Sequence, residues 1–478
     1  MEYEIVVGLE VHVELHTESK LFCSCPNSFT ANPNLNVCEV CLGFPGTLPL
    51  LNSYAVTQAL KASLALNCEV ALHSRFDRKN YFYPDIPKGY QISQYYIPIG
   101  SGGFLEIESE DGGNKKVGIT RVHMEEDAGK LVHAPTGEYS LVDYNRAGVP
   151  LIEIVSEPDI RSPQEARRYL EKLKSKMQYA QVSDCKMEEG SLRCDANISL
   201  RPQGATDFGA KTELKNMNSF KAVEKALEFE INRQAELLEN NEGVKPQTRR
   251  WEEDKGKTIV MRDKLQAHDY RCFVDPELAP IDLTTEEVEK IRANLPEFAS
   301  QKIERYVNDY NLPQYDAEVI TADPKLADYF ESCLQDYPHP KTVSNWIMVD
   351  FMALMNAEGK EPDEVLFMPS YLVELLNLVD EGTITGKMAK EVLEKSFNSG
   401  TNPRQVVEEE GMKQISNEDE LAEIVSRVMA DNPSSVNDYR EGKKKAMGFL
   451  VGQVMKATSG KANPQVVNEI LKKKLEEE

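Results

Sequence analysis

A short alternating segment at the start of the chain constrains its fold most strongly. Between positions 4 and 15, hydrophobic residues recur at every second position, and Glu10, His12 and Glu14 fall between them. A period of two is typical of a β-strand with one buried face. The other face would carry two carboxylates and an imidazole. That pattern suits either a metal site or a solvated strand surface, and this segment alone leaves both open.

Four later segments, 116–127, 150–158, 191–200 and 211–215, repeat this alternation. Their polar faces carry Glu125, Glu153, Glu157, Arg193, Asp195, Asn197, Lys211, Glu213 and Lys215. Antiparallel sheets are commonly covered on one side only, and helices expected at 162–179 and from 219 to before Gly243 would cover the apolar side. We therefore predict an α+β fold in which a mostly antiparallel sheet forms a cradle with covering helices.

The polar face of this sheet suggests phosphoryl transfer. Clustered carboxylates repel one another unless a cation neutralises them, and oxygen-rich sites favour Mg²⁺. Lysine and arginine among them can hold the phosphate oxygens that such a metal bridges. The chain has no Gly-rich Walker loop, because Gly256-Lys257-Thr258 lacks the upstream glycine. We expect ATP to be held by the metal and the sheet.

Four cysteines form a second candidate metal site, in the loop 23–41. Cys23 and Cys25 are followed by Cys38 and Cys41, a spacing that in a cytoplasmic chain favours tetrahedral Zn²⁺. Two disulfides or four buried thiols are the alternatives. With sulfur in all four positions, a bound zinc would be structural.

The segment 75–94 mixes basic and aromatic residues with two prolines, which predicts an ordered surface loop. Lys79 and Lys88 are candidates to meet anions there. The alternative is that both are ordinary exposed residues.

A length of 478 residues is too great for one core, so we expect several domains. Changes in pattern predict a cradle domain at 1–292, a helical domain at 293–403 and a helical tail at 404–478. From position 440 to 474 the tail has nine Lys or Arg against two Glu, in a chain of net charge −24. This segment predicts either an RNA contact or a solvated helix. No apolar run approaches the ~20 residues of a membrane span, so we expect a cytoplasmic protein.

Longer motifs show a family resemblance that covers the whole chain. It rests on segments 7–12, 78–85, 88–94, 123–130, 143–159 and 213–219. Together they resemble the B subunit of the aspartyl/glutamyl-tRNA amidotransferase, the GatB family. The chain departs from the family's pattern at Leu265, His268 and Val274.

The resemblance implies a reaction and a set of partners. The family uses ATP to phosphorylate the side-chain carboxylate of Glu-tRNA(Gln) or Asp-tRNA(Asn). Ammonia delivered from the amidase, or A, subunit then displaces the phosphate, and a small C subunit is the third member of the complex. By resemblance, the helical and tail domains would hold the tRNA.

The resemblance also assigns residues. The family's metal and kinase positions would fall on Glu10, His12, Glu125 and either Glu157 or Glu153. Its ammonia route would pass Lys79, Asp85, Lys88 and Asp275. The four cysteines match a zinc-bearing branch of the family. Two other functions are weighed against this one: a non-catalytic scaffold that docks tRNA, and a stand-alone metal-dependent hydrolase. The hydrolase motifs His-Glu-x-x-His and Gly-x-Ser-x-Gly do not occur in the sequence.

Overall fold

A computed structural model of the chain separates into two compact units, Met1–Phe298 and Ala299–Glu478. The structure describes residues 3–30, 32–134, 136–263, 270–412, 418–441, 443, 445–458 and 461–477. Leu265 and His268, two of the three departures from the family's pattern, lie outside these ranges, as does Lys444 of the basic tail. The domain boundaries at 292 and 403 remain predictions.

The first unit is built on a 12-stranded sheet with β1 (Tyr3–Glu14) near its middle. The other strands of this sheet are β2 (Glu69–Val70), β4 (Asp77–Asn80), β5 (Tyr90–Ser93), β6 (Gly100–Glu108), β7 (Asn114–Glu126), β10 (Pro150–Ser156), β11 (Leu192–Pro202), β12 (Thr212–Met217), β13 (Gln247–Glu252), β14 (Lys257–Asp263) and β15 (Phe273–Val274). The main strand order is β14-β13-β12-β11-β1-β10-β7-β5-β4-β15. Among the described pairs, only β12 and β13 run parallel, which confirms the predicted mostly antiparallel sheet.

The first unit also contains two sheets of two strands each. They pair β3 (His73–Ser74) with β16 (Ile281–Asp282) and β8 (Lys130–His133) with β9 (Ser140–Asp143).

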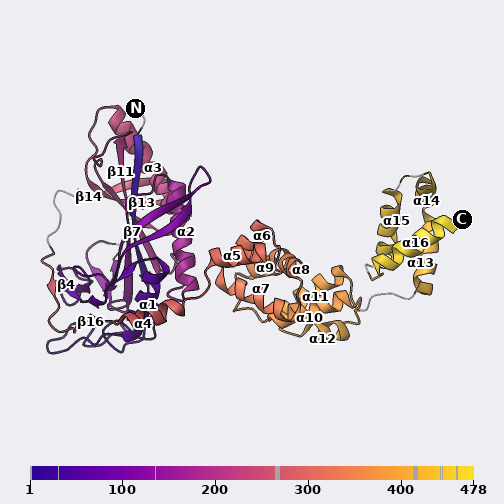
Figure 1. Ribbon diagram of the computed structural model, residues 1–478, viewed down its shortest axis with the longest axis horizontal. Coiled ribbons are helices and arrows are strands. Elements are labelled where there is room, and N and C mark those ends of the chain that lie inside the picture. The colour runs from indigo at the N-terminus through magenta and orange to yellow at the C-terminus, as the bar shows by residue number, and fades with distance from the viewer. Residues whose placement is uncertain are drawn as a thin grey trace. The chain divides into compact units, whose positions relative to one another are not determined.

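The alternation of β1 is visible in its burial. Val7, Val11 and Val13 are fully buried, whereas Glu10 and His12 on the other face are partly exposed. Helices α1 (Ser53–Ala65), α2 (Pro163–Tyr179) and α3 (Phe220–Glu239) pack against β7, β6 and β11. Figure 1 shows β1 in indigo within the sheet, with α2 and α3 along it. The polar face predicted from the sequence is therefore the face that these helices leave uncovered.

Local capping chemistry fixes where these helices begin. The side chains of Asn52, Ser162 and Ser219 each accept a hydrogen bond from a backbone N–H of the first turn of α1, α2 and α3. Thr284 and Glu287 form a reciprocal capping box at the start of α4 (Thr285–Ala293), which packs on α1. Each cap satisfies a backbone donor that the helix itself leaves free.

The segment 75–94 is not a continuous loop, so this prediction was wrong. It contains β4 and β5, which pair as an antiparallel hairpin from Asp77 opposite Ser93 to Asn80 opposite Tyr90. β5 in turn joins β7 through Ser93 and Glu125. The prolines that argued against regular structure lie in the turn between the two strands, where they remove no ladder hydrogen bond.

The second unit is helical, as predicted. Its described helices are α5 (Ala299–Asn308), α6 (Gln314–Thr321), α7 (Pro324–Asp336), α8 (Pro340–Trp346), the π-helix η2 (Ile347–Phe351), α9 (Met352–Glu358), α10 (Pro369–Asp380), α11 (Gly386–Ser399), α12 (Pro403–Glu409), α13 (Glu418–Asp431), α14 (Pro433–Arg440), α15 (Lys445–Ala457) and α16 (Pro464–Glu477). Phe330, Phe351 and Leu375 belong to one hydrophobic core, and Leu421 and Leu471 belong to another. None of the described helices has both the length and the hydropathy to cross a bilayer.

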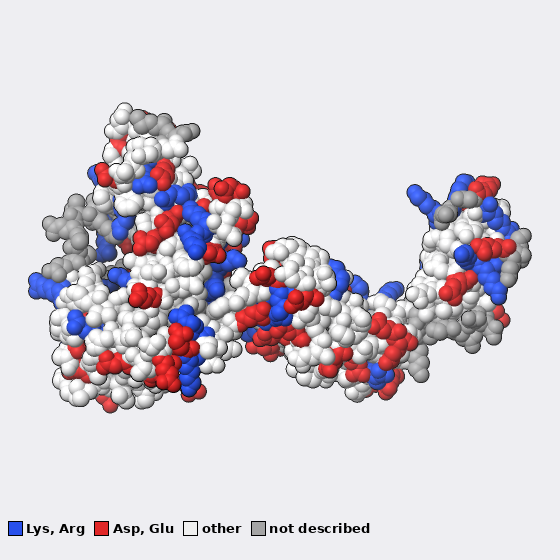
Figure 2. Space-filling model, viewed as in Figure 1, with Lys and Arg blue, Asp and Glu red and all other residues white. Residues whose placement is uncertain are grey.

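The last four helices carry both signs of charge. On the face visible in Figure 2, Lys and Arg side chains lie among Asp and Glu side chains. Lys443 pairs with Asp438 at 2.7 Å, and Nζ of Lys474 donates to Oγ of Ser426 at 2.5 Å. Part of the positive charge counted in the sequence is therefore matched locally.

Candidate functional site

The register of four neighbouring strands brings polar residues from distant parts of the chain into one row. His123 on β7 lies opposite Glu153 on β10, and Glu153 lies opposite His12 on β1. His12 lies opposite Arg193 on β11. Facing residues of antiparallel strands share one side of the sheet. The row therefore lies on the polar face.

Short contacts connect this row to Glu125, two residues beyond His123 on β7. Nε2 of His12 lies 3.2 Å from Oε1 of Glu125 and 3.5 Å from Oε2 of Glu153. Nε2 of His123 lies 3.6 Å from Oε2 of Glu125 and 3.5 Å from Oε2 of Glu153. Potential ligand atoms of Glu10, His12 and Glu153 lie within 4.8 Å of one another, as do those of His123, Glu125 and Glu153. We call these five residues the carboxylate–histidine cluster.

Burial and charge shift the pKa values in this cluster. Burial acts to raise the pKa of Glu125, but hydrogen bonds to His12 and His123 hold that pKa well below its usual value. Burial acts to lower the pKa of His12, but the carboxylates of Glu125 and Glu153 raise it to about 10. Burial, with the charge of Glu153, raises the pKa of Glu10. The cluster concentrates negative charge in a buried place and so favours a cation.

Glu157, which we expected as an alternative to Glu153, does not join the cluster. A rise of about 3.3 Å per residue carries it roughly 13 Å along the strand direction from Glu153. There, Oε1 of Glu157 accepts a hydrogen bond from Oγ1 of Thr120 at 2.7 Å. Alternation predicts which face a residue occupies, but two residues on one face can still lie far apart. We therefore leave Glu157 out of the candidate metal site.

Arg193 is bound to a carboxylate of the protein. Its Nη1 and Nη2 lie 3.2 and 2.5 Å from the two carboxylate oxygens of Asp127, and Nε of Arg146 lies 2.9 Å from Oδ2 of Asp127. The alternation that places His123 and Glu125 on the polar face also includes Asp127, but the sequence did not predict that Asp127 pairs with Arg193 or with Arg146. Asp127 directly follows β7, and its partners come from segments that only the fold brings together.

The strands β11 and β12 bring the remaining nucleotide candidates together on one side of the cluster. Nζ of Lys215 donates to Oδ2 of Asp195 and lies 3.4 Å from Oε1 of Glu213. Asp195 lies opposite Glu10, and Asn197 lies opposite Glu213. Oδ1 of Asn197 is buried and has no hydrogen-bond partner among the described residues. This side of the site therefore offers the ammonium group of Lys215 and, among the described residues, an acceptor without a partner in Oδ1 of Asn197.

Lys211 lies at the edge of this group. It is exposed and immediately precedes β12, so it shares the alternation of Glu213 and Lys215. At about 3.3 Å per residue, it lies roughly 13 Å from Lys215 along the strand direction.

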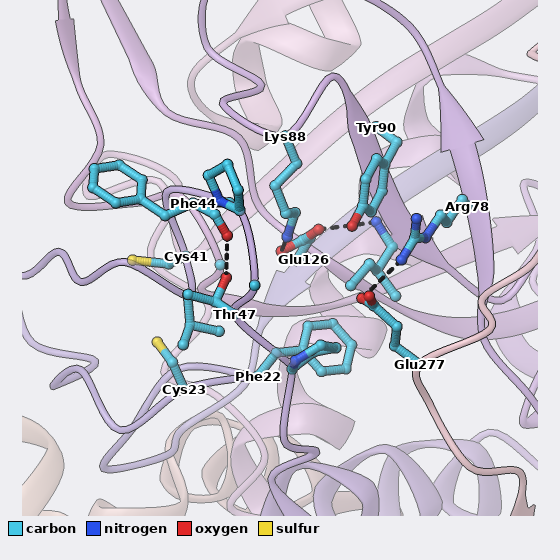
Figure 3. Close-up of a pocket in the computed structure, with 17 residues that line it drawn as sticks. Phe22, Cys23, Cys41, Phe44, Thr47, Arg78, Lys88, Tyr90, Glu126 and Glu277 are labelled. Atoms are coloured by element: carbon cyan, nitrogen blue, oxygen red, sulfur yellow. Dashed lines mark hydrogen bonds and ion pairs between the residues drawn. The ribbon is translucent and has the colours of Figure 1, made fainter.

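A cavity of about 190 Å³ lies on the other side of β7 (Figure 3). It is lined by Glu126, the neighbour of Glu125, and successive residues of a strand point to opposite faces. Nζ of Lys88 lies 2.5 Å from Oε2 of Glu126 in this cavity. Arg78 also lines it and pairs with Glu277 at 2.9 Å.

The residues expected along an ammonia route do not all lie on the same face of β4. Lys88 lines the cavity, whereas Asp275 is buried beside it and accepts a 2.7 Å hydrogen bond from Nε of Arg78. Lys79 alternates with Arg78 on β4 and lies over the ring of Tyr270, 4.9 Å from its centroid. Burial raises the pKa of Asp85, which lies in the turn between β4 and β5. The structure groups Lys88 with Asp275 and places Lys79 on the other face of β4.

The four cysteines of the loop converge as their spacing predicts. The sulfur atoms of Cys23, Cys25, Cys38 and Cys41 lie within 4.8 Å of one another. Tetrahedral zinc with Zn–S bonds of about 2.3 Å separates its sulfurs by roughly 3.8 Å, so this quartet fits one ion. A hydrogen bond from Cys23 lowers the pKa of Cys41 to about 5. Cys23 and Cys41 also line the cavity of Figure 3.

Besides Asp127 and Arg146, three residues of the site were not assigned a role from the sequence: His123, Glu126 and Arg78. His123 shares the alternation of Glu125 and could have been found from that signal. Glu126 falls on the opposite face, and Arg78 became recognisable only once β4 was paired with β5. Strand pairing, rather than residue type, was the missing information.

Comparison with known proteins identifies the class of protein to which the chain belongs. Residues 5–289 match the model of a family described as "GatB/GatE catalytic domain", and residues 328–475 match that of a "GatB domain". The chain is therefore a protein of the GatB/GatE class, and the cluster lies within the part that matches the catalytic domain.

Curated relatives identify the family more closely. The chain is 60% identical over 475 residues to a protein of Thermoanaerobacter pseudethanolicus, with 99% of this chain and 100% of the relative covered. It is 58% identical over 477 residues to one of Moorella thermoacetica, with coverage of 99% and 100%. It is 52% identical over 477 residues to one of Thermodesulfovibrio yellowstonii, with 100% of both covered. All three are named as the B subunit of aspartyl/glutamyl-tRNA(Asn/Gln) amidotransferase, and the chain belongs to this family.

Proposed function

We propose that this chain carries the kinase and amidation site of an ATP-dependent amidotransferase acting on Glu-tRNA(Gln), Asp-tRNA(Asn) or both. The γ-phosphoryl group of ATP is transferred to the side-chain carboxylate of the misacylated amino acid. Ammonia then attacks the carbonyl carbon, and phosphate leaves as the amide forms. The observation that carries this proposal is the meeting of three glutamates and two histidines from separate strands in the region matched by a catalytic-domain family.

The cluster suits this chemistry through its charge and its burial. Carboxylate oxygens of Glu10, Glu125 and Glu153 are the ligands that Mg²⁺ prefers. Glu153 offers an oxygen within 4.8 Å of ligand atoms of Glu10 and His12 in one group, and of His123 and Glu125 in another. When bound, Mg²⁺ would neutralise phosphate charge during transfer. His12 holds Glu125 and Glu153 in place through its contacts with both. Burial of Glu125 and His123 excludes water, which would otherwise hydrolyse the acyl phosphate.

The surrounding residues take supporting roles in this proposal. Lys215 and Lys211 supply positive charge toward the nucleotide, and Asn197 supplies an acceptor. Asp195 and Glu213 orient Lys215, while Arg193 acts through Asp127. Lys88 and Asp275 would lie on the ammonia route, with Lys79 on the far side of β4.

The partners in this proposal are the amidase, or A, subunit, the small C subunit, and the misacylated tRNA, in the cytoplasm. The amidase supplies ammonia, since amide formation needs a nucleophile that the cluster itself does not generate. The basic part of the tail would contact the tRNA backbone. The cysteine quartet would hold a structural zinc outside the reaction.

The experiment is an assay of the complex reconstituted from all three subunits, with each misacylated tRNA in turn. We expect ADP release with ATP and Glu-tRNA(Gln) or Asp-tRNA(Asn) before glutamine is added, and amide formation afterwards. Glu125→Gln should reduce amide formation by about 10³-fold or more, because it removes a buried charge from the site, and leave tRNA binding unchanged. Glu171→Gln, an exposed residue of α2, is the matched control.

Two outcomes would contradict the proposal. Wild-type turnover by the Glu125→Gln complex would remove the cluster from the chemistry. Absence of tRNA-dependent ADP release from the wild-type complex would favour the scaffold function instead.

A further inference from the structure

Lys20 is a buried lysine with an unusual environment. Its side chain is fully buried, and it is among the largest side chains of the protein to be so. In the described part of the chain, no Asp or Glu oxygen lies within the 4.0 Å of an ion pair with its Nζ. Burying an unpaired ammonium group is expensive, so another negative group should compensate for it.

The contacts of Lys20 point to the cysteine quartet. Its Nζ donates to the backbone oxygen of Asn36 at 2.6 Å and to that of Tyr144 at 3.4 Å. It also lies 3.9 Å from Sγ of Cys41. The two carbonyl groups are neutral. Among the contacts of Nζ within the described part of the chain, the thiolate of Cys41 is therefore the group that can carry a full negative charge; the nearby carboxylate of Glu126 pairs with Lys88 instead.

The surrounding backbone holds this contact in place. Asn36 lies within the cysteine loop, and its N–H donates to Oδ1 of Asn145 at 2.9 Å. Gly148 has φ +86°, and a Cβ there would lie 3.5 Å from Cβ of Cys41 and 3.6 Å from Cδ of Lys20. The lysine is thus enclosed between the loop and the segment before β10, and the contact does not depend on a freely moving side chain.

The charge of a four-cysteine zinc site explains why such a residue is needed. Zn²⁺ bound by four thiolates carries a net charge of about −2, which is unfavourable when buried. One backbone N–H, that of Cys38, donates to Sγ of Cys41 at 3.2 Å and compensates part of this charge. An ammonium group beside the same sulfur compensates more. Groups around a metal's ligands commonly tune how tightly the ion is held.

We propose that Lys20 is the buried counter-ion of a zinc-bound cysteine quartet and controls how strongly the loop retains its metal. This inference rests on the zinc site of the proposed function. It concerns metal retention, and it makes no claim about the kinase site.

The test compares zinc release from the full chain in its complex, for wild type and two neutral variants. Lys20→Met removes the charge and the donor, whereas Lys20→Gln removes the charge and keeps a donor. Lys130→Met, at an exposed position of β8, is the control. Zinc content is measured by mass spectrometry, and release by a chromogenic chelator.

We expect both Lys20 variants to release zinc about 10- to 100-fold faster than wild type, and the control to match wild type. Wild-type retention by Lys20→Gln would overturn the proposal, because the charge would then not matter. If both variants fail to fold, recovery of folded protein in excess Zn²⁺ supports the proposal, and no recovery overturns it.

The same measurement separates this inference from the function on which it rests. Wild-type complex isolated without stoichiometric zinc would overturn both the inference and the zinc site. ADP release and amide formation by that complex would leave the phosphoryl-transfer proposal intact.

Discussion

The two candidate metal sites of the first unit are assembled in different ways. The cysteine quartet comes from one loop, positions 23–41, and its four sulfurs fill a tetrahedral site completely. The carboxylate–histidine cluster draws on three strands, from Glu10 to Glu153, and lies on a sheet face that the helices leave uncovered. A site made from one loop can stabilise that loop. A site made across strands depends on the whole sheet and can accept a substrate.

Between the two metal sites, the larger effect on the reaction should follow from breaking the cluster at Glu153, which contacts both histidines. Glu153→Gln should reduce amide formation by about 10³-fold, or roughly 4 kcal/mol of transition-state stabilisation. Zinc content should stay at the wild-type value, because the quartet lies elsewhere. The measurement pairs single-turnover amide formation with metal analysis. A variant that loses zinc together with activity would show that the two sites are not independent.

The converse change removes a cysteine ligand. Cys41→Ser should abolish zinc binding and lower the free energy of unfolding by about 4 kcal/mol, which corresponds to a fall in Tm of roughly 8–16 °C. Differential scanning calorimetry and metal analysis check both. The Cys272→Ser variant, which changes a cysteine outside the quartet, is the control and should retain the zinc bound by the quartet.

The activity of the Cys41→Ser variant tests whether the cysteine loop has a structural or a catalytic role. Assayed well below its Tm, Cys41→Ser should still release ADP in response to misacylated tRNA. A loss as large as that of Glu153→Gln would mean that the cysteine loop shapes the reaction site, and the two metal sites would then share one role.

A smaller effect is expected from the tail, which belongs to neither metal site. Val406 and Val407 of α12 are buried in the core of the preceding helices, so a truncated chain that keeps this core should end after Met412 rather than at the expected domain boundary, 403. This truncation should weaken tRNA binding about tenfold and flatten its dependence on salt, because phosphate contacts are lost. Filter binding at several salt concentrations measures both. Equal affinity at every salt concentration would exclude the basic tail from tRNA binding.

The smallest effect should be that of Glu157→Gln. Its partner, Thr120, can donate to a glutamine as it does to the glutamate, and the cluster lies further along the strand. Amide formation should change by less than about twofold. Steady-state kinetics compares this variant with Glu153→Gln, which makes the same substitution four residues earlier. A loss comparable to that of Glu153→Gln would return Glu157 to the metal site.

The same contrast explains how much could be predicted from the sequence. The quartet follows from spacing, since residues close along the chain stay close in space. Alternation placed Glu10, His12 and Glu125 on one face, because a strand has a fixed period. Register decides which of those residues meet, and it depends on pairing between distant segments. For that reason Glu153 and Glu157 could not be distinguished, and the partnership of Arg193 with Asp127 was not foreseen.

The hairpin at 77–93 shows a second limit. Its short strands hold Arg78 and Tyr90, and the turn between them contains the prolines, so local composition resembles that of a loop. Their pairing is stabilised from outside, by the contact of β5 with β7 at Ser93 and Glu125. Such tertiary stabilisation leaves no local signal in the sequence.

The most direct test of the central claim is the location of a divalent ion in crystals of the complex soaked in Mn²⁺. An anomalous difference map should show a peak bonded to carboxylate oxygens of Glu10, Glu125 or Glu153 on the polar face of the sheet. Glu153→Gln crystals should lose that peak and keep the zinc peak at the cysteines. Mn²⁺ bound elsewhere in the first unit, with none at the cluster, would contradict the assignment of the cluster as the metal site.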